Sequence, residues 1–217
     1  MSSFNPFAAR RALTATVLVG GLTLAACARD DDDARPTTTS TGAAPSTTSA
    51  TSAPTGSATS SNAFNDADVE FAQRMIVHHE QAIEMAEIAQ EPARKAGAEV
   101  IALAGRIEAG QDPEIERMIG WLRSWGAPVQ MDTSGGHDMS EMAGMMSAED
   151  MDSLDAMAGT EFDDMWLTMM VEHHEGAIEM ATDIQAEGTN ADVKTLAGQI
   201  VAAQQAEVDE MRPLLDG

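Results

Sequence analysis

The feature that most limits the possible folds is an internal repeat. The segment MIVHHEQAIEMA at residues 75–86 returns as MVEHHEGAIEMA at residues 170–181, so the two double histidines are 95 residues apart (173 − 78). A second pair of similar segments follows, VIALAGRIEAGQDPEIERM at 100–118 and VKTLAGQIVAAQQAEVDEM at 193–211. A register kept over so many positions predicts two similar structural halves related by a pseudo-twofold axis.

Each repeated segment has the spacing of an amphipathic helix. In the first histidine segment, apolar residues recur at intervals of three and four along two neighbouring ridges, which indicates a helix with one buried face. Asn65 or Asp66 can cap its start. Pro113 predicts a kink or break in the second helix, because proline removes a backbone donor. Two helical hairpins predict an all-α fold, a four-helix bundle over residues 63–217.

The apolar faces of these helices contain polar side chains. His79 and His174 fall in the middle of the apolar arc of their helices, and His78 and His173 lie at its edge. Polar residues also interrupt the apolar stripe of the partner helices: Gln111, Glu114, Gln204 and Glu207. An unpaired buried polar group costs on the order of 1–3 kcal/mol. These groups must therefore bond to one another, to water or to a ligand.

Two interpretations of this polar core remain open. The structural one pairs each central histidine with a residue of the partner helix: His79 with Gln111 or Glu114, and His174 with Gln204 or Glu207. The functional one is a metal site, because imidazole is the commonest metal ligand in proteins. The glutamines and glutamates would then orient each ring through its other nitrogen. The symmetric pairing of four histidines, with methionines one turn away, favours the metal.

The connection between the halves, residues 131–157, is rich in methionine and holds the fifth histidine, His137. Ser147 and Asp150 form a capping box that predicts a short helix through Met157. The part before this helix is polar and rich in glycine, so it offers no core for its methionines to fill: Met139, Met142, Met145 and Met146. Thioether sulfur is a soft ligand that suits Cu(I), so the predicted cofactor is copper.

The N-terminus predicts an exported lipoprotein. Residues 1–26 contain Arg10 and Arg11 followed by an apolar run, which is typical of a signal peptide. The run ends in LAAC, which resembles a lipobox and implies lipid on Cys27. A plain secretory signal is the alternative. Residues 27–62 consist mainly of Ser, Thr, Pro and Ala, so we expect a disordered tether. The mature protein should then be anchored by lipid to the outer face of the cell membrane.

Charge and cysteine content exclude other partners and sites. The chain has 217 residues and a formal net charge of −24, so binding to nucleic acid through a basic surface is excluded. The same acidic field attracts cations. Since Cys27 is the only cysteine, neither an intramolecular disulfide nor a thiolate metal site is expected in the folded domain.

The paired motifs MIVHHEQAIEMA and VEHHEGAIEMA, with GMMS between them, resemble the bacterial domain of unknown function 305 family over about residues 63–217. The resemblance implies a ferritin-like four-helix bundle that is usually exported, with copper handling in some relatives and no settled activity. It also implies ligand roles for His78, His79, Met85, His173, His174 and Met180. Val77 and Glu172 stand where the family often has proline, which implies straighter helices here.

These features suggest three functions from different classes, which they support unequally. The first is a lipoprotein that binds copper for buffering, resistance or transfer. The second is a di-iron or di-manganese oxidase, but those sites need Glu-x-x-His on two helices. The residues three positions before the histidines are Met75, Ile76, Met170 and Val171, so the oxidase is disfavoured. A zinc protease would need His-Glu-x-x-His, which does not occur. The third is a non-catalytic envelope module that binds a protein partner, with its histidines purely structural.

Overall fold

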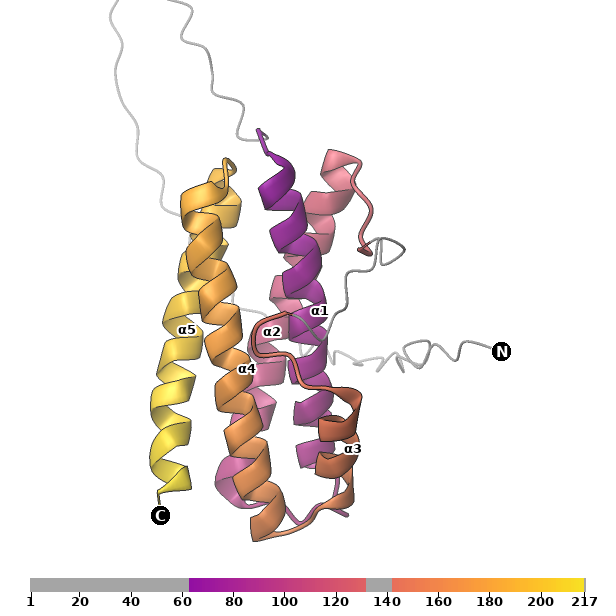
Figure 1. Cartoon of the computed structure of the whole chain (residues 1–217), viewed down its shortest axis with the longest axis vertical. Coiled ribbons are helices and arrows are strands. Elements are labelled where there is room, and N and C mark those ends of the chain that lie inside the picture. Colours follow the sequence, from indigo (N-terminus) through magenta and orange to yellow (C-terminus); the bar gives the residue numbers. More distant parts are fainter. Residues whose placement is uncertain (1–62, 132–141, 217) are drawn as a thin grey trace, which may run out of the picture. The chain divides into compact units, whose positions relative to one another are not determined.

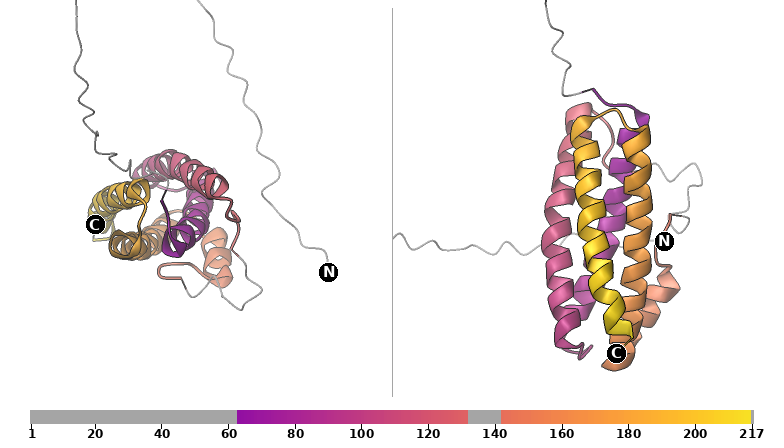
Figure 2. Two further views of the ribbon diagram at one scale, coloured as in Figure 1. Left: turned by 90° about the horizontal axis from the view of Figure 1, so that it is seen from above. Right: turned by 90° about the vertical axis from the view of Figure 1, so that its left-hand side faces the viewer.

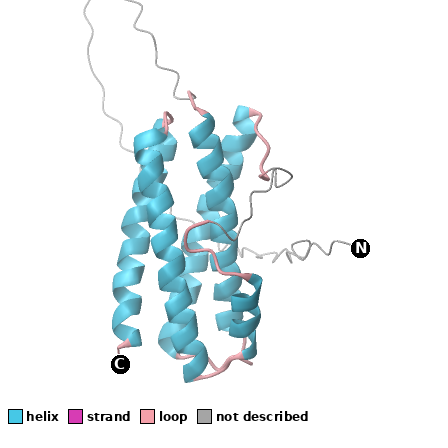
Figure 3. Cartoon of the chain, viewed as in Figure 1, coloured by secondary structure: helices cyan, strands magenta, loops and turns pink. Residues whose placement is uncertain are grey.

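The computed structural model describes residues 63–131 and 142–216, and within these ranges it has five helices and no strand (Figures 1 and 3). The four long helices and the short α3 have these bounds: α1 Asp66–Gln90, α2 Ala98–Trp125, α3 Ala148–Ala156, α4 Thr160–Glu187 and α5 Ala191–Leu215. Among these described helices, none is long and apolar enough to span a membrane. The leader, the tether, Cys27, His137 and Met139 lie outside the described residues.

The long helices form the predicted four-helix bundle of two hairpins. α1 packs against α2, α4 packs against α5, and contacts between α1 and α4 join the two hairpins (Figure 2). The short α3 lies against α4. The buried apolar residues divide into two clusters, one around Phe162 and Trp166 and the other around Phe71 and Leu122. Along α1 and α4 the double histidines fall between the segments that contribute to these two clusters.

The helix ends largely follow the sequence signals. Asn65 caps α1, and Ser147 with Asp150 forms the predicted capping box of α3. α2 continues through Pro113 as one helix, so the break that was one of the two expectations at this proline does not occur. Proline leaves the carbonyl four residues earlier without its helical donor. Here that residue, Ala109, is exposed, so water can bond its carbonyl.

Two aspartates join the halves in a way that the sequence patterns did not indicate. Asp68 of α1 is fully buried and accepts hydrogen bonds from the backbone N–H groups of Thr189 and Asn190, both at 3.1 Å. Asp163 of α4, at the equivalent repeat position, accepts from the Gly97 N–H at 3.0 Å. Gly97 and Asn190 are the residues that begin α2 and α5. Each hairpin's first helix thus supplies a carboxylate to the start of the other hairpin's second helix, where a negative charge is stabilising.

Candidate metal centre

The repeat brings one histidine from each half into direct contact at the centre of the bundle. His78 of α1 and His173 of α4 are both fully buried, and their ring centroids lie 3.8 Å apart with the rings tilted by 41°. We call these two residues the inner pair. Although the sequence placed them at the edge of the apolar arc, the α1–α4 contact covers them completely.

The hydrogen bond of His78 fixes the position of its proton. Its Nε2 lies 3.1 Å from the carbonyl oxygen of Ala143. A carbonyl can only accept, so Nε2 carries the proton and the neutral ring has its lone pair on Nδ1. This Nδ1 is buried and has no hydrogen-bond partner. Neither ring nitrogen of His173 makes a hydrogen bond of full geometry, although the nearby backbone of His78 partly offsets the effect of burial on the pKa of this ring. The inner pair therefore presents lone pairs that no described protein group uses.

His79 and His174, which we call the outer pair, each bind a carboxylate. His79 Nε2 lies 2.7 Å from Glu114 of α2, and His174 Nε2 lies 2.8 Å from Glu207 of α5. Each ring donates to its carboxylate, which leaves the Nδ1 atoms as buried nitrogens without a partner. Of the two partners considered for each outer histidine, the structure selects the glutamate.

The glutamines of the polar stripe are buried but do not bond to the histidines. Both amide atoms of Gln111 and the Oε1 atom of Gln204 are buried without a hydrogen-bond partner. A hydrogen-bonded structural network would have used these atoms, because leaving them unpaired is costly. The polar core therefore has more donors and acceptors than its internal hydrogen bonds satisfy.

Burial keeps the inner pair uncharged. It lowers the pKa of His78 to about 3, and the neighbouring His79 adds to this shift. Burial also holds the pKa of His173 well below its usual range, and His78 contributes to the effect. At neutral pH both rings are therefore neutral imidazoles, which is the form that binds a metal ion.

The nitrogen and oxygen ligands do not complete a site by themselves. Within residues 63–131 and 142–216, no three His, Cys, Asp or Glu side chains are arranged to hold a metal ion. The donor set here is instead a neutral imidazole pair with methionines one helical turn before it. Met75 and Met170 occupy those positions and are fully buried. Such a set fits a soft ion that accepts thioether sulfur, and it does not fit magnesium or calcium, which require oxygen.

Comparison with known proteins assigns the chain to a family. The model of the family described as Domain of unknown function (DUF305) matches residues 68–215. The chain belongs to the DUF305 family. A DUF305 structure from Streptomyces coelicolor is 34% identical, with a TM-score of 0.63 over 69% of this chain and 92% of that one. A DUF305 fragment from Deinococcus radiodurans is 29% identical, with a TM-score of 0.63 over 70% and 97%. Among curated proteins no match was found.

One similar protein has been solved in metal-bound forms. CopM in its Cu(I)-bound form is 27% identical to this DUF305 protein, with a TM-score of 0.57 over 69% of this chain and 95% of CopM. CopM has also been solved with Cu(II) and with silver. The fold similarity therefore extends to a protein whose structures hold soft and borderline metal ions.

The predicted methionine ligands of this DUF305 domain fall into two groups. Met142 is buried, and Met145 and Met146 are half-buried in a segment that touches the inner pair through Ala143. Met85 and Met180 lie seven residues beyond the inner histidines, which is about 10 Å along a helix axis. These two predicted ligands therefore lie about two helical turns away from the rings of the inner pair.

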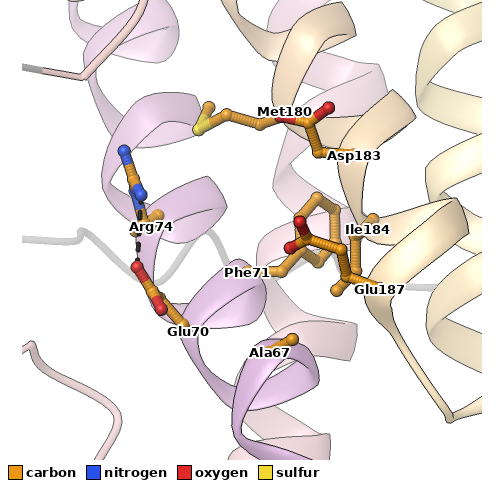
Figure 4. Close-up of a pocket in the computed structure, with 8 residues that line it drawn as sticks. All are labelled: Ala67, Glu70, Phe71, Arg74, Met180, Asp183, Ile184 and Glu187. Carbon is orange, nitrogen blue, oxygen red and sulfur yellow. Dashed lines mark hydrogen bonds and ion pairs between the residues drawn. The ribbon is translucent and has the colours of Figure 1, made fainter.

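Met180 lines a surface cavity between α1 and α4 (Figure 4). Phe71 and Ile184 form its apolar part, and the ion pair between Glu70 and Arg74 lies on one side of it. The cavity contains no histidine. It is therefore separate from the buried centre of the DUF305 domain.

Two groups beside the inner pair were missed by the sequence analysis: the side chain of Gln81 and the backbone carbonyl of Ala143. Gln81 bonds both backbone groups of Met146, with its Nε2 at 2.9 Å from the carbonyl oxygen and its Oε1 at 2.8 Å from the amide nitrogen. A signal for Gln81 existed, since the two repeats read HHEQAI and HHEGAI and so differ at this position. No signal pointed to Ala143, because a backbone carbonyl has no sequence signature.

Proposed function

We propose that this DUF305 protein binds copper at the outer face of the cell, for buffering, resistance or transfer of the metal. The observation that carries the proposal is the buried inner pair, whose two neutral rings each present one nitrogen lone pair without a hydrogen-bond partner. Unused nitrogen lone pairs in an apolar core are costly, and a metal ion would use them.

The remaining ligands favour copper over other metals. Methionine sulfur is soft and selects Cu(I), and imidazole serves both Cu(I) and Cu(II). In the outer pair, Glu114 and Glu207 already hold one nitrogen of each ring, an arrangement that commonly orients metal-binding histidines. The copper-bound and silver-bound structures of CopM support the same choice. The net charge of −24 would also raise the local concentration of cations.

A structural role for the histidines is the alternative, and one observation favours it. The outer pair is bonded to carboxylates at 2.7 and 2.8 Å, as expected of a core network in a non-catalytic envelope module. That network accounts for one nitrogen in each of His79 and His174. It gives no role to the nitrogen lone pairs of the inner pair or to the amide of Gln111.

Titration with copper tests the proposal. The chain without its leader, residues 28–217, is titrated with Cu(I) under a competing chelator, beside a variant in which all four bundle histidines are replaced by glutamine: His78, His79, His173 and His174. We expect the variant to lose at least about tenfold in affinity, because ligand nitrogens are removed, while circular dichroism shows that it keeps its helices. Magnesium and calcium serve as control ions that should not compete.

The structural alternative predicts a different pair of results. The wild type would retain no copper at micromolar concentrations, and the histidine variant would unfold far more easily. Equal copper binding by the wild type and the histidine variant would refute the proposal.

Anchoring at the membrane is a separate part of the proposed function. We expect Cys27→Ser to move the full-length protein from the membrane fraction to the soluble fraction, because the thiol that would carry lipid is removed and two lipid chains hold a protein stably on a bilayer. Fractionation and mass spectrometry of the mature N-terminus measure this. A Cys27→Ser variant that stays fully membrane-bound, or a mature protein with an unmodified Cys27, would contradict it.

A further inference from the structure

A short segment outside the bundle is fitted closely over the inner pair. Residues 142–146, which we call the strap, lead into α3 and lie across α1 and α4 (Figure 1). The strap contacts α1 through His78 and Gln81. Its close approach to α4 occurs at Gly176.

Gln81 holds the strap on the α1 side. Its side-chain amide makes two hydrogen bonds to the backbone of Met146, one to the carbonyl oxygen at 2.9 Å and one from the amide nitrogen at 2.8 Å. A side chain that pairs with both groups of one residue fixes the position and the direction of the backbone there. The third hydrogen bond, from His78 Nε2 to Ala143, lies three residues earlier in the strap.

Gly176 gives the strap its place on the α4 side. A Cβ atom at Gly176 would lie 2.1 Å from the carbonyl oxygen of Ala143 and 2.7 Å from the Cα of Gly144. Gly144 has a φ of +76°, and a Cβ there would lie 2.6 Å from the carbonyl oxygen of Glu172. Only glycine permits this contact between backbones, since every other residue brings a side chain into it.

Gln81 and Gly176 occupy the same position in the two repeats (81 + 95 = 176). On either side of this position the repeats agree, with HHE before it and AIEMA after it. One copy therefore supplies the residue that holds the strap, and the other copy supplies the space for it. The repeat loses its symmetry where the strap touches the centre.

We propose that Gln81 and Gly176 are positioning residues that seat the strap as part of the metal site. Seated in this way, the strap holds three methionines in the segment that contacts His78: Met142, Met145 and Met146, of which Met146 also packs against the apolar core. Its Ala143 carbonyl also keeps the proton of His78 on Nε2, so that Nδ1 presents the lone pair. This inference rests on the proposed copper binding and adds that the strap supplies sulfur ligands in addition to the bundle methionines Met75 and Met170.

Two substitutions test the seating of the strap, each with a matched control. Gly176→Ala places a methyl group where the strap lies, and Gly198→Ala is its control, because a Cβ at Gly198 meets nothing within 4 Å. Alanine favours a helix more than glycine does, so neither change weakens α4 or α5 as a helix. Gln81→Ala removes two hydrogen bonds to the strap. Its control is Gln73→Ala, which removes a hydrogen bond from the same helix to the Pro128 carbonyl at 2.7 Å.

Two readouts are measured on residues 28–217: Cu(I) affinity under a competing chelator, and hydrogen exchange at the Met146 amide. We expect both test variants to lose about tenfold in Cu(I) affinity and to exchange the Met146 amide about tenfold faster, while both controls behave like the wild type. The exchange readout needs no metal, so it reports the seating by itself.

The outcomes separate the two proposals. If the wild type binds copper and both test variants keep its affinity although their Met146 amide exchanges faster, the strap is not part of the site. If the amide exchange is unchanged in both variants, these residues do not seat the strap. If the wild type binds no copper, the proposed function is refuted, and the ligand role of the strap is refuted with it.

Discussion

Acidification from about pH 7.5 to about pH 4.5 is expected to lower the free energy of unfolding of the metal-free protein by about 5 kcal/mol. Burial lowers the pKa of His78 to about 3 and holds that of His173 well below its usual range. In the unfolded chain both histidines titrate near pH 6.5. The unfolded state therefore binds protons first. Stability is complete above about pH 6.5 and falls by about 1.4 kcal/mol per pH unit for each histidine below it.

Urea denaturation at several pH values measures this loss, and the double variant His78→Gln with His173→Gln is the control. The variant keeps the same acidic surface, so subtracting its pH dependence removes the contribution of the carboxylates. We expect the variant to lose about 5 kcal/mol less than the wild type over the same range, because it lacks the two buried histidines. Equal losses in the wild type and the double variant would mean that the inner pair is not held neutral by the fold.

Replacing the methionines of the connection by leucine is expected to lower Cu(I) affinity by about 100-fold and to change Cu(II) affinity much less. The variant replaces four of the five methionines that precede α3 in the connection: Met139, Met142, Met145 and Met146. Leucine has nearly the volume of methionine, so packing changes little, but it has no sulfur to offer. Titration with each oxidation state under a competing chelator gives the two affinities.

A matched control for this variant lies in the same connection. Met151 and Met157 flank or belong to α3, and both are half-buried against the apolar core. Their replacement by leucine should leave both copper affinities unchanged. If this control loses as much Cu(I) affinity as the fourfold variant, or if Cu(II) affinity falls equally, the loop methionines are not the soft ligands.

The bundle and the inward direction of the histidines could be predicted because they depend on local periodicity. His79 and His174 lie in the middle of an apolar arc, and a helix that buries such an arc must bury them. The capping box at Ser147 is also local, and α3 begins where it indicated. The interruption expected at Pro113 was not a break, because the carbonyl that proline leaves unbonded belongs to exposed Ala109.

The arrangement within the centre could not be predicted in the same way. Helical periodicity places His78 and His79 on a buried face but does not say which of them meets the other hairpin. The contact between the His78 and His173 rings depends on the rotation of α1 against α4, and the contact of His78 with Ala143 joins residues 65 positions apart. Such contacts follow from packing between distant segments. The difference between Gln81 and Gly176 was visible in the repeats, but its meaning required the strap.

The crossed carboxylates of Asp68 and Asp163 have a consequence for hairpins made separately. Each carboxylate bonds the start of a helix in the opposite hairpin, so a separate hairpin lacks this carboxylate at the start of its second helix. A hairpin expressed alone can regain this contact by pairing with a second copy of itself, since a twofold interface presents the same patch on both partners. Such a homodimer would carry two identical residues at the position of Gln81 and Gly176. Joining both halves in one polypeptide allows that position to differ between them. A single chain can therefore hold one strap on one side of its pseudo-twofold axis, whereas a symmetric dimer would have to hold two such segments or none.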